Sequence, residues 1–115
     1  MADKADAWMF AEDYVPESEI VVEARTAAVE LGADPVSPGT GAALRMLAAV
    51  AGARTVLEVG TGAGVSGLWL LDGMPADGVL TSIDSEAEFH QQARRVFAAA
   101  GVLTERPTGL AGTPT

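Results

Sequence analysis

The 115-residue sequence contains no cysteine, few aromatic side chains and few basic ones. Without cysteine there is no disulfide framework, no cysteine-ligated zinc and no thiol nucleophile. Only 7 lysines and arginines stand against 16 aspartates and glutamates, which gives a formal net charge of −9. Because nucleic-acid binding requires basic side chains that neutralise phosphates, the composition argues against a nucleic-acid partner.

Long hydrophobic runs are also missing. No stretch of about 18 apolar residues is free of charge, so the sequence predicts no transmembrane helix and no membrane partner. The first residues carry acids where a secretory signal has a basic segment, and we therefore expect a cytoplasmic protein. Hydrophobic residues make up 49% of the chain and aromatic residues 5%. Alanine supplies much of the apolar content, so the predicted core is built from small side chains.

What is present divides the chain into three parts. Residues 1–16 lack a clear apolar period and are expected to form a mobile acidic arm that ends at Pro16. Residues 17–101 show alternating helical and strand patterns and form the predicted domain. Residues 102–115 are rich in threonine, glycine and proline, and are expected to be a disordered tail without the third strand of a doubly wound fold.

The predicted elements of the middle part are two helices followed by a β-α-β-α unit. Leu44, Leu47 and Val50 are expected on the buried side of the second helix. Ser85 and Glu88 have the spacing of a capping box and predict the start of the last helix. Two strands joined by a crossover helix predict a parallel, right-handed βαβ unit, and hence an α/β fold. The predicted elements are helices from Ser18 to Leu31 and about 40–51, a strand at 55–59, a helix at 65–73, a strand at 79–83 and a helix ending near 100.

The chemistry of the sequence is concentrated in the glycine-rich turn that follows the first predicted strand. Gly60, Thr61, Gly62, Ala63 and Gly64 leave that strand and open the next helix. Such a turn permits positive φ values and presents the N–H groups of a helix N-terminus to an anionic or dipolar ligand. Asp84 closes the second predicted strand, so a βαβ unit places it beside the turn at the carboxyl edge of the sheet.

Two ligand classes fit this arrangement. Residues 62–67 match the dinucleotide pattern G-x-G-x-x-G, and Asp84 follows at a suitable distance. In that interpretation the first glycine comes three residues after the strand, and Glu58 has no role. The alternative ligand is S-adenosylmethionine: Glu58 binds its ammonium group, the helix N-terminus holds its carboxylate and Asp84 binds its ribose. This second interpretation gives each unusual residue a role, and we favour it. His90, the only histidine, is expected at the surface.

These residues resemble the S-adenosylmethionine-dependent O-methyltransferases of the catechol and caffeoyl-CoA type. The similarity extends over about residues 17–101, and its most specific stretch is Thr55–Leu70. The resemblance implies a Rossmann-like methyltransferase fold, truncated to two N-terminal helices and β-α-β-α. It also implies a cofactor site in which Glu58 and Gly60 hold the methionine amino end, Ser66 binds the carboxylate and Asp84 binds the ribose hydroxyls. The residues expected around the cofactor are Val36, Glu58, Gly60, Thr61, Gly62, Ser66 and Asp84.

The resemblance further implies methyl transfer to a hydroxyl of a small, catechol-like substrate, assisted by a divalent metal, usually Mg²⁺. The family's metal ligands and catalytic residues belong to later strands, so no catalytic or metal-binding residue is expected within this chain. The chain resembles the amino-terminal half of such an enzyme and is expected to be inactive alone. A homodimer remains open as an assembly. The alternatives are a fragment of a nicotinamide-binding Rossmann domain and a non-catalytic module that binds an adenosyl ligand.

Overall fold

The computed structural model describes residues 3–101 and 108–112. The chain alternates helices and strands after an all-helical start, which confirms the predicted α/β class. The helices are α1 (Lys4–Asp13), α2 (Glu19–Glu30), α3 (Pro38–Val50), α4 (Val65–Gly73) and α5 (Ala87–Ala99), with a single 3₁₀ turn, η1 (Gly62–Gly64), before α4. The strands are β1 (Thr55–Val59), β2 (Val79–Asp84) and β3 (Thr108–Gly112).

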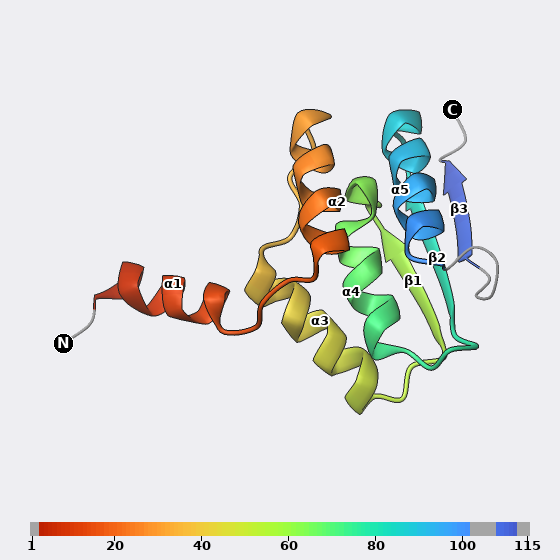
Figure 1. Cartoon of the computed structure of the whole chain (residues 1–115). Coiled ribbons are helices and arrows are strands. Elements are labelled where there is room, and N and C mark those ends of the chain that lie inside the picture. The colour runs from red at the N-terminus through yellow and green to blue at the C-terminus, as the bar shows by residue number, and fades with distance from the viewer. Residues whose placement is uncertain (1–2, 102–107, 113–115) are drawn as a thin grey trace.

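The three strands form one parallel sheet with β2 in the centre. Thr55 is paired with Val79 and Val59 with Ile83, so β1 and β2 end at the same edge. Figure 1 shows α4 and α5 against one face of the sheet, with α2 packed beside them. On the opposite face Leu57 is 64% exposed. The carboxyl ends of β1 and β2 therefore meet at one edge, and the loops that follow them can form a common site.

The core consists mainly of small side chains, as the composition predicts, and it depends on close approach between helices. Helix α4 lies at its centre, and Trp69 on this helix is 4% exposed. A Cβ atom at Gly41 of α3 would lie 2.3 Å from the Trp69 Nε1 atom. A Cβ atom at Gly73 of α4 would lie 2.2 Å from the Arg45 carbonyl oxygen. Glycine thus allows α3 and α4 to pack closely enough for a core with few large residues.

Several predicted boundaries are confirmed. Ser18 caps α2, since its hydroxyl accepts the Val21 N–H, and β1 has the predicted bounds. Strand β2 extends one residue further than predicted, to Asp84. Among the residues that the structure describes, none of the helices has the length and apolar character needed to cross a membrane.

The amino-terminal segment forms a helix, which the sequence analysis did not predict when it described a mobile acidic arm. Helix α1 begins after Asp3, whose side chain accepts the Asp6 N–H at 2.9 Å. None of its residues is buried. The apolar period was absent because this helix has no buried face, so a search for periodicity could not find it. The N-cap aspartate was the available signal.

The expected buried side of the second predicted helix is wrong for Leu47 and Val50, whereas Leu44 is partly buried. Helix α3 begins at Pro38, two residues before the predicted start, because the Ser37 hydroxyl accepts the Thr40 N–H and caps it. Its buried residues are Gly41 and Ala48, whereas Leu47 is 59% exposed and Val50 is 80% exposed. The small residues face α4 because only they allow the close helix packing described above.

The predicted capping box at the start of the last helix is also wrong. Helix α5 begins after Glu86, which has no side-chain capping bond, and Ser85 lies outside the helix. The Asp84 carboxylate accepts the Glu86 N–H at 2.9 Å and so holds the residue that precedes the helix.

The predicted disordered tail contains a strand. Residues 108–112 form β3 and pair in parallel with β2, with Leu80 opposite Thr108 and Asp84 opposite Gly112. The expectation of disorder for 102–107 and 113–115 lies outside the described residues. The strand was missed because its glycine-rich sequence has little strand character, while the backbone ladder with β2 requires no side-chain pattern.

Candidate functional site

A glycine-rich loop joins the end of β1 to the start of α4, as the sequence predicts. Gly60, Gly62 and Gly64 have positive φ values of 94°, 55° and 104°. Ala63 has φ 65° although it carries a Cβ atom, and such residues are uncommon outside strained or functional segments. The Gly60 N–H donates to the Ile83 carbonyl at 2.7 Å, so the loop is fastened to β2. The loop is therefore a fixed and strained turn at the carboxyl edge of the sheet.

Asp84 lies beside this loop, where it was predicted. Its Oδ2 atom accepts the N–H groups of Thr61 at 2.8 Å and Gly62 at 3.4 Å, and Oδ1 accepts the Glu86 N–H. Burial raises the pKa of Asp84, but these N–H donors and the nearby His90 outweigh burial and hold the pKa below its ordinary value. Asp84 is therefore an ionised acceptor at neutral pH, with its carboxylate directed to the loop.

Glu58 lies on the helix-covered face of β1, opposite Ser82 in the sheet register. The Ser66 hydroxyl donates to Glu58 Oε2, and the Ser82 hydroxyl lies 2.8 Å from Oε1. Burial raises the pKa of Glu58 above its ordinary value; the two hydroxyl bonds lower it in part, and the charge of Asp84 adds to the rise. A cation bound next to Glu58 would favour its ionised form and offset the cost of burial.

Two buried hydroxyls connect these acids. Thr61 and Ser82 are both 0% exposed, and their oxygens lie 2.8 Å apart. We call Glu58, Thr61, Ser66, Ser82 and Asp84 the glycine-loop cluster. Its hydrogen bonds run without a break from Ser66 through Glu58, Ser82 and Thr61 to Asp84. The sequence analysis missed Ser82; the signal for it was a polar residue two positions before Asp84, on the same face of the strand.

Val36 is the predicted site residue that belongs neither to the glycine loop nor to the hydrogen-bonded cluster. It precedes α3 in the chain, and its partly buried side chain packs against the core. The adjoining N-terminus of α3 is held by Glu12 of α1, whose carboxylate accepts the Gly39 N–H at 2.7 Å and the Ser37 hydroxyl at 3.0 Å. This link between α1 and α3 was not predicted, because it joins residues that are far apart in sequence.

His90 lies in the first turn of α5 and is partly buried, which corrects the expectation of a surface residue. Its Nε2 atom is buried and has no hydrogen-bond partner among the residues that the structure describes. Its charge contributes to the lowered pKa of Asp84.

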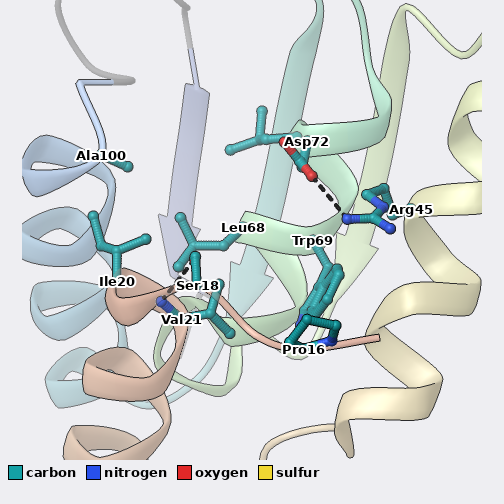
Figure 2. Close-up of a pocket in the computed structure, with 10 residues that line it drawn as sticks. Pro16, Ser18, Ile20, Val21, Arg45, Leu68, Trp69, Asp72 and Ala100 are labelled. Atoms are coloured by element: carbon teal, nitrogen blue, oxygen red, sulfur yellow. Dashed lines mark hydrogen bonds and ion pairs between the residues drawn. The ribbon is translucent and has the colours of Figure 1, made fainter. Parts of the chain in front are cut away.

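The molecule also has a cavity away from the loop (Figure 2). Its volume is about 290 Å³, and its lining includes residues of α2, α3 and α4. At its side, Arg45 Nη1 lies 3.4 Å from Asp72 Oδ2, and the guanidinium lies 5.2 Å from the centre of the Trp69 ring. No member of the glycine-loop cluster lines this cavity, so it is separate from the candidate site.

A metal ion finds no matching ligand set in residues 3–101 and 108–112. No three histidine, aspartate or glutamate side chains of this part gather closely enough to hold one. The magnesium expected from the resemblance is therefore assigned to no described residue of this chain.

Comparison with known proteins identifies the family. The family model described as O-methyltransferase matches residues 11–106. A protein of Mycobacteroides abscessus with an O-methyltransferase name is 50% identical over 102 residues, which cover 89% of this chain and 47% of that protein. One from Mycolicibacterium vanbaalenii, similarly named, is 54% identical over 102 residues, covering 89% of this chain and 45% of the relative. The chain thus spans about half the length of these relatives.

Solved structures agree with the sequence matches. The O-methyltransferase TomG of Streptomyces achromogenes, which is involved in tomaymycin synthesis and was solved in complex with S-adenosylmethionine, is 32% identical. It superposes with a TM-score of 0.78 over 94% of this chain and 49% of that one. The residues matched by the family model include the whole glycine-loop cluster, and the superposition supports the Rossmann-like fold implied by the loop and sheet. The chain belongs to the O-methyltransferase family.

Proposed function

We propose that the glycine-loop cluster binds S-adenosylmethionine, and that this chain supplies the cofactor-binding part of an O-methyltransferase. The observation that carries the proposal is the placement of two carboxylates on either side of one strained glycine loop. Asp84 bonds to the loop directly and Glu58 is linked to it through Ser82 and Thr61, and Glu58 has a raised pKa while Asp84 has a lowered one. A ligand with a cationic end and a hydroxyl-bearing sugar matches this pair.

The methionine end of the ligand fits the surroundings of Glu58. An ammonium group beside Glu58 would favour its ionised form, which burial disfavours in the free protein. Ser66 now donates its single hydroxyl proton to Glu58. When the ammonium takes that acceptor position, Ser66 is free to turn to the ligand carboxylate, at the N-terminus of α4 where backbone N–H groups favour an anion.

The ribose fits Asp84. An ionised carboxylate has about four acceptor positions, and three N–H groups now occupy Asp84. The contact with the Gly62 N–H is the longest of these, at 3.4 Å. Displacement of this weak contact would leave two positions, which is the number that a pair of vicinal ribose hydroxyls requires.

Family membership supports the reaction. Bound S-adenosylmethionine supplies a methyl group on a sulfonium sulfur, and the acceptor would be a hydroxyl of a small, catechol-like molecule. In this scheme Glu58 and Gly60 hold the amino end of the cofactor. Ser66 binds its carboxylate, Asp84 binds its ribose and Val36 borders it. None of the described residues is assigned to the acceptor hydroxyl or to a metal, so the chain alone would bind cofactor without methyl transfer. We include a homodimer of this protein as the candidate assembly.

Calorimetric titration of the purified chain tests the proposed ligand. We expect S-adenosylhomocysteine to bind, and NADH to give no heat of binding. Glu58→Gln keeps the shape of the side chain and removes its charge, so it should weaken binding at least about ten-fold. Leu57→Gln changes the neighbouring residue on the exposed face and serves as the matched control. Binding of NADH without binding of the adenosyl ligand would support the nicotinamide alternative and contradict the proposal.

A non-catalytic module for adenosyl ligands is the second candidate function. It is favoured because all the residues to which we assign a role bind the cofactor, and none of them is assigned to the methyl acceptor. Methyl transfer from S-adenosylmethionine to catechol, measured with the 115-residue chain and Mg²⁺, distinguishes the candidates. Turnover by this chain alone would contradict both the binding module and the expected inactivity. Binding without turnover is expected, and added turnover on mixing with the remaining part of a family domain would favour the enzyme.

A further inference from the structure

We propose that Thr61 and Ser82 are positioning residues that form a directional hydroxyl chain and hold Glu58 in place for the ligand ammonium group. This inference deepens the proposed function and rests on it for the identity of the ligand. Both hydroxyls are 0% exposed, so neither can touch a ligand in the described structure. Their role would be exerted through Glu58.

The direction of the chain follows from the number of protons. Ser82 has one hydroxyl proton and lies 2.8 Å from two acceptors, Glu58 Oε1 and Thr61 Oγ1. When Glu58 is ionised it has no proton to donate, and as an anion it is the stronger acceptor. Ser82 therefore donates to Glu58, and Thr61 donates to Ser82. Protonation of Glu58 on Oε1 would reverse both bonds.

Because the Thr61 and Ser82 hydroxyls are buried, solvent cannot substitute for them. Loss of the Ser82 hydroxyl removes the bond to Glu58 Oε1 and the bond to Thr61, and loss of the Thr61 hydroxyl removes the second bond of Ser82. Ser66 differs from them, because it lies partly exposed at the start of α4 and can turn towards a ligand. During ligand binding the Ser82 bond is then the one that keeps Glu58 oriented.

The same pair of hydrogen-bonded hydroxyls links the two ends of the site. The Thr61 side chain bonds to Ser82, while its backbone N–H bonds to Asp84 at 2.8 Å. The charged groups that face this network are Asp84, from the end of β2, and His90 from α5, which acts on Asp84. The ionisation of Glu58 is therefore coupled to the loop that also holds the ribose-binding acid.

The test uses the full chain with four variants. Ser82→Ala and Thr61→Val each remove one hydroxyl, and Thr61→Ser keeps the hydroxyl while it removes a methyl group. Thr81→Val is the matched control, because it lies on the same strand with its side chain on the opposite face. The first readout is the pKa of the Glu58 carboxyl in the free protein, followed by NMR of its side-chain carbon.

We expect Ser82→Ala to raise the Glu58 pKa further and Thr61→Val to raise it by less, while Thr61→Ser and Thr81→Val leave it unchanged.

The second readout is the affinity for S-adenosylhomocysteine, measured as a function of pH. Ser82→Ala should weaken binding about ten-fold at pH 7, the loss of one hydrogen bond to a charged group, and move the acid limb of the profile to higher pH.

An unchanged Glu58 pKa in Ser82→Ala would overturn the inference, as would an equal change in Thr81→Val. If Ser82→Ala fails to fold, the Glu58 pKa is compared between Thr61→Val and Thr61→Ser. Only Thr61→Val removes the hydroxyl, so only this variant should raise the pKa. If the wild-type chain binds no S-adenosylhomocysteine while its Glu58 pKa responds as expected, the ligand proposal fails and the positioning role stands. If the wild-type chain binds S-adenosylhomocysteine but the Glu58 pKa does not respond to the substitutions, the ligand proposal stands and the positioning role fails.

Discussion

The glycine-loop cluster and helix α1 differ in how the fold holds them. Each side chain of the cluster has a hydrogen bond to another element, and Thr61 and Ser82 are fully buried. In α1 no residue is buried, and three large apolar side chains of this helix, together with Tyr14 directly after it, face solvent. The exposed fractions are 65% for Trp8, 61% for Met9, 69% for Phe10 and 73% for Tyr14. Figure 1 shows α1 extending away from the rest of the molecule.

The two regions therefore depend on different interactions: α1 on local ones and the glycine-loop cluster on tertiary packing. Helix α1 is formed by its own cap and is attached through the contact of Glu12 with the N-terminus of α3. The cluster requires β1, β2 and α4 to be packed together before any of its side-chain bonds can form. Substitutions in the packed region should therefore cost far more free energy of unfolding than substitutions on α1, and local changes at Glu12 should lie between them.

The largest effect is expected for Gly73→Ala. The added Cβ would lie 2.2 Å from the Arg45 carbonyl oxygen, which is backbone and cannot turn away. Helices α3 and α4 must separate, and overpacking of this kind costs about 1–3 kcal/mol. Urea unfolding followed by circular dichroism measures the loss. Trp8→Ala on α1 is the contrasting variant, with an expected change within about 0.5 kcal/mol. Equal losses in the two variants would contradict the comparison.

Asp84→Asn should have the next largest effect, because three N–H donors lose a charged acceptor. The expected loss at pH 7 is about 1–3 kcal/mol. The folded pKa of Asp84 lies below its ordinary value, so its contribution is present above the unfolded pKa and is lost as pH falls through the folded pKa. The difference between wild type and variant should therefore shrink in acid.

Unfolding curves from pH 3 to pH 7 test this dependence. Asp72→Asn, on an exposed residue of α4, is the control and should give a small difference at every pH. A wild-type advantage over Asp84→Asn that stays constant down to pH 3 would contradict the assigned ionisation.

A smaller effect, between that of the packed region and that of Trp8→Ala, is expected for Glu12→Gln. The carboxylate accepts the Gly39 N–H and the Ser37 hydroxyl at the positive end of α3, and loss of its charge there costs about 0.3–1 kcal/mol. Hydrogen exchange of the Gly39 amide should become faster, because this contact protects it. Glu30→Gln at the end of α2 is the control. Unchanged exchange at Gly39 would show that Glu12 does not fasten α1 to the domain.

The central part of the fold could be predicted because its signals are local. Ser18 caps α2, and the β-branched run before Gly60 gives β1 its bounds. The glycine loop and Asp84 were placed correctly because a βαβ unit brings both strand ends to one edge. Helix α1 and strand β3 were missed, since neither carries a period of buried residues. The buried side of α3 was mistaken because hydrophobicity was expected to decide it, whereas close packing against Trp69 and Gly73 selects small residues.

The sequence by itself determined the α/β order, the glycine loop, the two acids and, through its similarity, the O-methyltransferase family. The tertiary structure decided how those acids behave. Glu58 has a raised pKa because helices bury it, and Asp84 has a lowered one because loop amides bond to it. Ser82 became part of the site through its register with Glu58 across two strands. Burial and cross-strand distance arise between segments remote in sequence, so no local pattern records them.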